Sequence, residues 1–287
     1  MISSLNNTIA KSYGNRMRHS VSEKKTIPFI GVYDVFSAAL AGKFFDGIFI
    51  SGFGFAASYY GLPDIGFNTW SDLVNFVQRV RVVLPQQNIL VDIDDGFADT
   101  EVACHVVSLL ESAGASGVIL EDQARPRRCG HVGGKRILPL ELALERLTRV
   151  LETRRDLFVV ARTDATDHKE IFERVKAFSA TDADAILVDG IGDFSLLEEI
   201  RSVTKKPLVF NQISGGAAKG ISLDELGKAG VSLALFSTPC LFAAQEAMTK
   251  TLEGLKATGL LEVNNGGVGL PDCQALLNSN LKGRQIT

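Results

Sequence analysis

The chain has 287 residues, of which 46% are hydrophobic and 22% are charged, and its formal net charge is −3. This composition excludes a disordered polymer, and the slight negative charge argues against nucleic-acid binding. Its longest apolar stretches are interrupted well before the roughly 18 residues that a membrane span requires.

The N-terminal segment, residues 1–25, is polar and lacks the apolar run of a secretion signal. Four cysteines are scattered along the chain without a CxxC pair, which is typical of proteins in a reducing compartment. The sequence therefore predicts a cytoplasmic protein whose first folded domain begins near residue 26.

Eight short apolar segments follow, and segments with helical periodicity separate most of them. Strands that are apolar without alternation are buried on both faces. Eight such repeats favour a (β/α)8 barrel over residues 26–258, with a doubly wound sheet as the alternative. The predicted strands are 28–32, 47–50, 88–91, 117–120, 157–161, 185–188, 207–210 and 232–236. The predicted helices are 71–84, 99–113, 140–153, 168–180, 194–203 and 223–229.

Nearly every predicted strand ends in polar residues. The carboxyl ends of barrel strands meet at one mouth, so these side chains are expected to face a common ligand. Helix capping is the alternative at single positions, but it explains neither Glu121 nor Arg162. The polar residues are Tyr33, Asp34, Ser51, Asp92, Asp94, Glu121, Asp122, Arg162, Asp164, Asp189, Asn211 and Ser237.

Two connections, 53–70 and 122–139, are longer than a barrel needs. The second contains four arginines, one lysine, a histidine, a cysteine and three glycines, which indicates a mobile lid rather than a solvated basic loop. After residue 258 the chain is interrupted by NNGGVG before a last helix at 270–277. We expect this C-terminal tail, residues 259–287, to pack on the barrel or on a partner subunit.

Three acidic residues, Asp92, Asp94 and Asp95, lie in the segment VDIDDGF directly after a predicted strand. Carboxylates this close repel one another unless a cation compensates, and Mg²⁺ is the usual ion at oxygen ligands. An aspartate-rich turn that caps the next helix is the alternative. Glu121 and Asp122, one strand further on, favour the metal.

Three further features point to chemistry at the mouth. Cys129 lies between Arg128 and His131, and neighbouring positive charge is expected to lower its pKa and suit it to proton transfer. Arg162 follows an apolar strand and is expected to clamp a carboxylate or phosphate. The turn beginning at Ser51 has amide groups that would cradle an oxyanion, although the same residues suit a plain turn.

Five motifs together resemble the isocitrate lyase and phosphoenolpyruvate mutase superfamily, over roughly residues 27–255. They are SGFGFAASYYGLPDIG, DIDDGF, LEDQARPRRCGH, ARTDA and FNQISGG. The resemblance implies a (β/α)8 barrel and a homotetramer, a dimer of dimers, in which the C-terminal helices are exchanged between neighbours. It also implies a small oxo- or hydroxy-acid substrate and a Mg²⁺ cofactor, with Mn²⁺ as an alternative ion.

The resemblance assigns roles residue by residue. Cys129 becomes the catalytic acid of a lyase, and Arg162, His131 and Glu121 assist it. Metal ligands are Asp92, Asp94, Asp64 and Glu121. Substrate-binding residues are Ser51, Gly52, Phe53, Arg128, Gly130, Asp189, Asn211 and Ser214.

The sequence departs from the lyase pattern at Asp95, at Asp189, at Ser214 and at residues 217–219. These positions meet the distal part of the substrate, so isocitrate and methylisocitrate are not implied. We expect a Mg²⁺-dependent lyase that cleaves an alkylmalate- or alkylcitrate-type 2-hydroxy acid to a 2-oxo acid and a carboxylate. The alternatives are a phosphonate mutase or hydrolase, an oxaloacetate hydrolase or decarboxylase, and a non-catalytic binding barrel.

Overall fold

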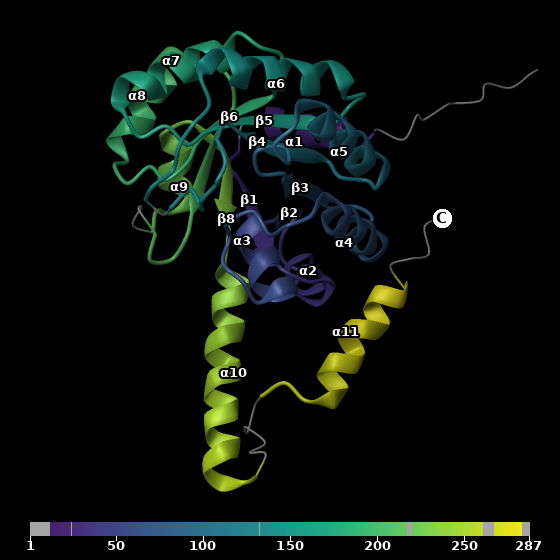
Figure 1. Cartoon of the computed structure of the whole chain (residues 1–287). Coiled ribbons are helices and arrows are strands. Elements are labelled where there is room, and N and C mark those ends of the chain that lie inside the picture. The colour runs from purple at the N-terminus through teal and green to yellow at the C-terminus, as the bar shows by residue number, and fades with distance from the viewer. Residues whose placement is uncertain (1–11, 24, 132, 217–219, 261–266, 283–287) are drawn as a thin grey trace, which may run out of the picture.

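A computed structural model describes residues 12–23, 25–131, 133–216, 220–260 and 267–282. Eight parallel strands close into one barrel in sequence order, with β8 paired to β1, so the predicted (β/α)8 barrel is confirmed (Figure 1). The strand ends agree with the prediction to within two residues. The strands are β1 (Ile27–Val32), β2 (Gly47–Ile50), β3 (Asn88–Asp92), β4 (Gly117–Glu121), β5 (Phe158–Thr163), β6 (Ala185–Val188), β7 (Leu208–Gln212) and β8 (Val231–Phe236).

Helices follow most strands and surround the barrel. Several begin at side-chain caps, as in α5, where the Asp99 carboxylate accepts from the backbone amides of Glu101 and Val102. The helices are α1 (Tyr13–Ser22), α2 (Val35–Ala41), α3 (Gly52–Phe55), the π-helical turn η1 (Ala56–Tyr60), α4 (Trp70–Val83), α5 (Thr100–Ser112), α6 (Leu140–Thr153), α7 (His168–Ser179), α8 (Ser195–Val203), α9 (Leu223–Lys228), α10 (Pro239–Thr258) and α11 (Leu270–Lys282).

Two apolar layers hold the barrel together. One fills its interior and includes Phe29, Phe49, Phe158 and Leu233. The other lies between the strands and the helices and buries the outward-facing strand side chains, so both faces of the strands are covered. This double burial explains why the strands are apolar without alternation.

Helix α1 closes the amino end of the barrel, although the sequence analysis assigned no element to this polar segment. Met17 is fully buried in the same layer as the barrel interior. Arg18 donates to the carbonyl oxygens of Asp156 and Leu157 and to the carboxylate of Asp184. Met17, with Val21 packed against the same layer, and Arg18 thus dock a helix that is largely polar.

The two long connections differ in structure. The first, 53–70, begins with α3 and η1, helical turns that the sequence analysis did not assign. The second connection, residues 122–139, is the lid. Its two ends are held together, because the amide of Ala124 donates to the carbonyl oxygen of Arg136 and Gln123 forms a β-bridge with Ile137. Residues 217–219, where the sequence departs from the lyase pattern, lie outside the described residues.

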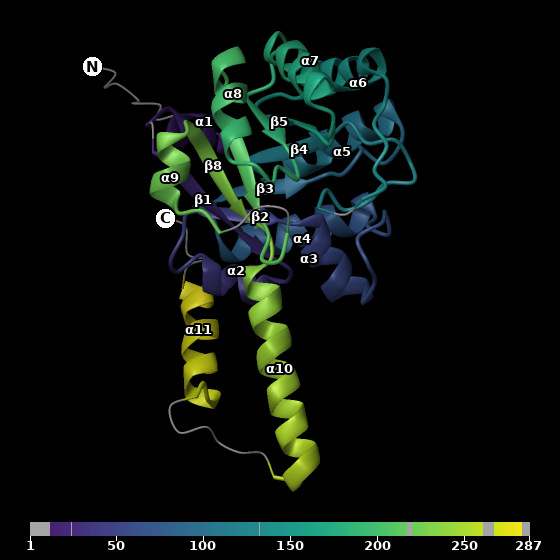
Figure 2. The same ribbon diagram turned by 90° about the vertical axis from the view of Figure 1, so that its left-hand side faces the viewer.

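Helix α10 extends away from the barrel, and none of its residues is buried (Figures 1 and 2). Helix α11 is longer than predicted and contacts α2, with Leu276 buried. In the ranges that the structure describes, no helix is both long and apolar enough to cross a membrane.

Candidate active site

The carboxyl ends of strands β2 to β8 surround one cavity at the mouth of the barrel. Polar strand-end residues form its wall together with part of the lid, and apolar residues of the barrel interior form its floor. The lining residues are Phe49, Ser51, Phe53, Asp64, Asp92, Ile119, Cys129, Gly130, His131, Arg162, Leu187, Asp189, Asn211, Ile213, Leu235 and Ser237.

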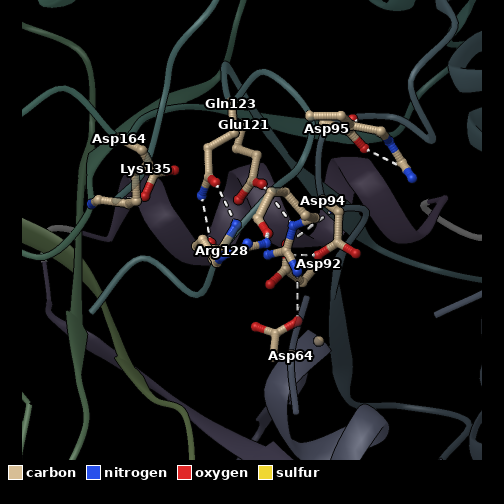
Figure 3. Close-up of polar contacts among 12 residues, drawn as sticks. Asp64, Asp92, Asp94, Asp95, Glu121, Gln123, Arg128, Lys135 and Asp164 are labelled. Carbon is tan, nitrogen blue, oxygen red and sulfur yellow. Dashed lines mark hydrogen bonds and ion pairs between the residues drawn. The ribbon is translucent and has the colours of Figure 1, made fainter. Parts of the chain in front are cut away.

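A buried arginine of the lid lies among the acids that the sequence analysis assigned to a metal. The guanidinium of Arg127 lies 2.5 Å from Asp64, 3.0 Å from Asp94 and 3.0 Å from Glu121. Its side chain is 1% exposed. Figure 3 shows these three carboxylates directed toward one another. Three of the four predicted metal ligands therefore share one cation from the lid.

Two neighbouring carboxylate oxygens lack a hydrogen bond. Oδ1 of Asp94 and Oε2 of Glu121 are buried, and guanidinium nitrogens of Arg127 and Arg162 lie 3.0 and 3.3 Å away without the geometry of a hydrogen bond. A Cβ atom built on Gly52 would lie 3.1 Å from Oδ1 of Asp94 and 3.2 Å from Oδ2 of Asp92. Glycine at this position keeps the space between the two carboxylates and the cavity free.

Negative charge exceeds positive charge in this cluster. Burial raises the pKa of Asp92, of Glu121 and of Asp94, the last to about 8, although nearby arginines act in the opposite direction. The buried ion pairs of the mouth join six carboxylates to three permanent cations. The acids are Asp64, Asp92, Asp94, Glu121, Asp164 and Asp189, and the cations are Arg127, Arg162 and Lys135.

These oxygen ligands suit a hard divalent ion such as Mg²⁺. In the described residues, no three His, Cys, Asp or Glu side chains are already arranged around a metal position. Arg127 accounts for this arrangement, because it draws three of the carboxylates toward its own nitrogens. The unbonded oxygens and the excess negative charge nevertheless fit a divalent cation at this cluster.

Arg162 lies at the centre of the cavity wall. Its guanidinium makes two parallel hydrogen bonds to Asp164, at 2.9 and 3.0 Å, and lies 2.7 Å from Asp189. Although burial alone would raise it, the pKa of Asp164 is lowered to about 2 by Arg162 and Lys135. These carboxylates hold the arginine in place while it still faces the cavity.

The lid is docked on the mouth with Cys129 at the cavity wall. Burial raises the pKa of the Cys129 thiol to about 11, so the expectation of a lowered pKa is wrong. Positive neighbours do not lower the pKa of the thiol, because its partial removal from water disfavours the charged thiolate more strongly. His131 lies beside it, with Nε2 3.2 Å from the Asn211 amide nitrogen and 3.6 Å from Asp189.

The structure does not bring every predicted residue to the cavity. Ser214 is exposed, and Arg128 donates to the carbonyl oxygen of Arg127 instead of lining the cavity. Ser51 lines the cavity and also caps α3 by accepting from the amide of Gly54 at 3.4 Å. Ser51 therefore both caps a helix and lines the cavity.

Three residues at the site were not singled out from the sequence. Arg127 and Lys135 carry lid charges into the acids, and Gln123 clamps the lid by bonding the amide and carbonyl of Arg128 at 2.9 and 2.8 Å. The sequence shows several basic residues in the lid and acidic residues at the strand ends, which together favour ion pairs between the lid and the mouth. It does not show which of two adjacent arginines points inward.

Comparison with known proteins gives a consistent result. The family model described as phosphoenolpyruvate phosphomutase matches residues 18–256. The 2-methylisocitrate lyase of Shewanella oneidensis is 28% identical over 88% of each chain. The chloroplastic carboxyvinyl-carboxyphosphonate phosphorylmutase of Arabidopsis thaliana is 34% identical over 85% of this chain and 75% of that protein.

A solved structure shares the whole architecture. The crystal structure of 2,3-dimethylmalate lyase, a member of the PEP mutase/isocitrate lyase superfamily, superposes with a TM-score of 0.89. The two chains are 25% identical, and the match covers 95% of this chain and 94% of that one.

Proposed function

Because the chain belongs to the phosphoenolpyruvate mutase/isocitrate lyase superfamily, we propose that it is a Mg²⁺-dependent carbon–carbon lyase. The proposed substrate is a 2-hydroxy di- or tricarboxylate of the alkylmalate or alkylcitrate type. The products are a 2-oxo acid, such as glyoxylate or pyruvate, and a carboxylate. The observation that carries the proposal is the half-buried thiol of Cys129 on the wall of a cavity that Arg162, Asp64 and Asp92 also line.

The acid cluster is the proposed metal site. Asp92, Asp94, Asp64 and Glu121 would hold Mg²⁺, with Mn²⁺ as an alternative ion. When bound, the ion supplies positive charge that stabilises the oxygen on which negative charge develops. The raised pKa values of Asp92 and Asp94 support this assignment, because these groups lack enough positive charge of their own.

The protein's own groups would bind and orient the oxo-acid end of the substrate. The amides that begin α3, at Gly52 and Phe53, and the hydroxyl of Ser51 would cradle its carboxylate. Arg162 would add a guanidinium held in position by Asp164 and Asp189. A preorganised cation of this kind stabilises developing charge without reorganising during the reaction.

Proton transfer would begin at the 2-hydroxyl group and end at Cys129. A carboxylate of the acid cluster accepts the hydroxyl proton, the adjacent carbon–carbon bond breaks, and its electron pair remains on the departing carboxylate fragment. The Sγ–H of Cys129 then protonates that carbanion. A pKa of about 11 keeps the thiol protonated at neutral pH, which is the state that a general acid needs.

A panel assay tests the reaction class. Alkylmalates and alkylcitrates are supplied with Mg²⁺, and release of glyoxylate or pyruvate is measured by a coupled enzyme. Turnover of one such compound, lost when Mg²⁺ is chelated, is the expected result. No turnover of any of them, with clear turnover of phosphonopyruvate or oxaloacetate, would contradict the lyase assignment.

Phosphonate chemistry is the second candidate function, favoured by the 34% identity to a carboxyphosphonate phosphorylmutase. The same cradle and Arg162 would bind a phosphonopyruvate-like compound, and a phosphorus–carbon bond would be formed or broken. Phosphorus NMR of the protein with phosphonopyruvate distinguishes the two candidates. A new phosphorus resonance that appears only with active-site residues intact would favour this second function.

The C-terminal region supports an assembly of several subunits. Met248 and Leu252 on α10 are 57% and 63% exposed, and an apolar groove between α2 and the start of α10 includes Phe44, which is 77% exposed. We propose that residues 259–287 form a separate tail beyond the 26–258 barrel and that these apolar surfaces are covered in a homotetramer. Sedimentation analysis tests this assembly.

The proposed location is the cytoplasm. All four cysteines are free thiols in the structure, which suits a reducing compartment. Proteomic analysis of cell fractions tests the location independently of the reaction.

A further inference from the structure

A lysine of the lid contacts the site from outside the cavity, and the reaction described above gives it no role. Nζ of Lys135 donates to the carbonyl oxygen of Gly130 at 2.7 Å and to Oδ1 of Asp164 at 3.1 Å. Its side chain is 7% exposed, and Figure 3 shows it beside Asp164. The ammonium group therefore joins the lid backbone, directly after Cys129, to the end of strand β5.

The Gly130 peptide fits closely against the barrel mouth. A Cβ atom built on Gly130 would lie 1.8 Å from Oδ2 of Asp189, and one built on Gly190 would lie 2.7 Å from the Gly130 carbonyl oxygen. Among the described residues, Lys135 is the hydrogen-bond donor to that carbonyl. Removing the ammonium group would leave a buried carbonyl oxygen without a donor, which favours undocking of the lid.

Gly133 and Gly134, the described lid residues between His131 and Lys135, are open to solvent. Side-chain positions built on Gly133 and Gly134 have no atom within 4 Å, and both residues are exposed. After the contacts of Gly130 and His131, Lys135 is thus the next described residue at which the lid contacts the barrel. Its partner Asp164 is fully buried and is itself held by Arg162.

We propose that Lys135 is a positioning residue, which holds Cys129 at the cavity by tying the Gly130 carbonyl to Asp164. The inference rests on the proposed function only for the statement that the position of Cys129 affects turnover. The docking itself is measurable without any substrate. Because Lys135 does not line the cavity, its loss affects the placement of the thiol more than the binding of ligand.

Site-resolved alkylation tests this role. Wild-type protein and Lys135→Met are treated with N-ethylmaleimide, with and without Mg²⁺ and oxalate, and modified peptides are quantified by mass spectrometry. We expect Cys129 to react about 10-fold faster or more in Lys135→Met, because an undocked thiol is more exposed and more readily ionised. The buried Cys104 is the internal control and should not change.

Two further variants separate docking from general effects. Lys169→Met removes a surface lysine that is 85% exposed and should leave the alkylation of Cys129 at the wild-type rate. Lys135→Arg retains a charged donor and should restore much of the protection. Equal Cys129 rates in wild type and Lys135→Met would overturn the proposal, as would equal acceleration at Cys104 or in Lys169→Met. If Lys135→Met does not fold, Lys135→Gln takes its place with the same criteria.

Kinetics supply the second readout once a substrate is identified. Lys135→Met should lower kcat while leaving KM and the affinity for Mg²⁺ and oxalate near wild type. A raised KM with unchanged kcat would contradict a positioning role. Absence of lyase activity in the wild type would contradict the proposed function, yet the alkylation result would still decide whether Lys135 docks the lid.

Discussion

Charged side chains gather at both ends of the barrel, but their hydrogen-bond partners differ. At the amino end, Asp184 accepts hydrogen bonds from Arg18, from Arg154 and from the amide of Val159. Glu111 likewise accepts from three consecutive backbone amides. Each carboxylate oxygen there has a donor, as expected of a network that joins α1 and the strand ends.

At the mouth, carboxylates outnumber cations, and buried oxygens of Asp94 and Glu121 have no hydrogen bond. Burial raises the pKa of both groups. Folding alone does not require such an arrangement, because a partly satisfied buried network destabilises a protein. The surplus of buried carboxylates indicates that the mouth is completed by a ligand, whereas Asp184 and Glu111 at the amino end are paired within the fold.

Loss of a carboxylate should therefore have opposite consequences at the two ends. Asp92→Ala should abolish Mg²⁺-dependent turnover, by about 10³-fold or more, because it removes a proposed metal ligand. Its thermal stability should be close to wild type, since losing one acid lessens repulsion among the others.

The matched variant at the amino end is Asp184→Ala. It should lower stability by about 1–3 kcal/mol, because the amide of Val159 and two partly buried arginines lose this acceptor, while the folded protein keeps its turnover. Activity assays and denaturant unfolding of both variants check the contrast. An Asp92→Ala protein that keeps wild-type activity and metal dependence would contradict the assignment of the metal site to Asp92.

Replacing the lid thiol tests whether Cys129 is the catalytic acid. Cys129→Ser keeps the size of the side chain but makes it a far weaker acid, so turnover should fall by about 10²- to 10⁴-fold. Oxalate binding in the presence of Mg²⁺, measured by calorimetry, should remain. Hydrogen exchange of the lid with ligand bound distinguishes lost chemistry from lost closure. Near-normal turnover by the serine variant would make Cys129 a passive lid residue.

Replacing Arg127 tests whether the buried acids need a nearby cation for the protein to be stable. Arg127→Met should lower stability by about 3–5 kcal/mol in metal-free buffer, because it leaves three buried carboxylates without their partner. Mg²⁺ should restore part of that stability, since it supplies positive charge to the same cluster. Denaturant unfolding with and without Mg²⁺ measures both effects. A loss that Mg²⁺ does not reduce would argue against a metal at these residues.

The smallest effect is expected from Arg18→Met at the amino end. Its side chain is 31% exposed, so solvent weakens its ion pairs, and a loss of about 1 kcal/mol is expected. The loss should be the same with and without Mg²⁺. A Mg²⁺-dependent difference would show that the two ends are not independent.

Much of the fold could be predicted because its signals are local. Apolar segments and their polar ends identified every strand of the barrel and placed residues such as Asp92 and Arg162 at the mouth. Helix α1 escaped prediction because its docking depends on Met17 and Arg18, whose partners lie far away in the sequence.

The site was less accessible to sequence reasoning because it depends on long-range contacts. Arg127 enters the acid cluster while the adjacent Arg128 does not, and only the path of the lid backbone decides between them. The pKa of Cys129 was predicted in the wrong direction for a similar reason. Neighbours in sequence indicate local charge, but burial depends on how the lid docks.

Binding of a divalent cation at the mouth should depend on pH, because an ionisable group lies among the proposed ligands. Asp94 has an ordinary pKa of 3.8, which burial raises to about 8 in the folded, metal-free protein. The folded state therefore keeps a proton that the unfolded chain releases. The stability that this group contributes is fully present below its unfolded pKa and is lost as pH rises toward 8. Bound Mg²⁺ requires the deprotonated carboxylate.

Calorimetric titration of Mg²⁺ between about pH 6 and 8, in buffers of different ionisation enthalpy, is the most direct test. We predict that the affinity for Mg²⁺ rises by up to about 10-fold per pH unit and that about one proton is released per ion bound. Asp94→Asn should weaken binding and remove most of the pH dependence. Mg²⁺ affinity that is independent of pH, without proton release and unchanged in Asp94→Asn, would contradict the claim.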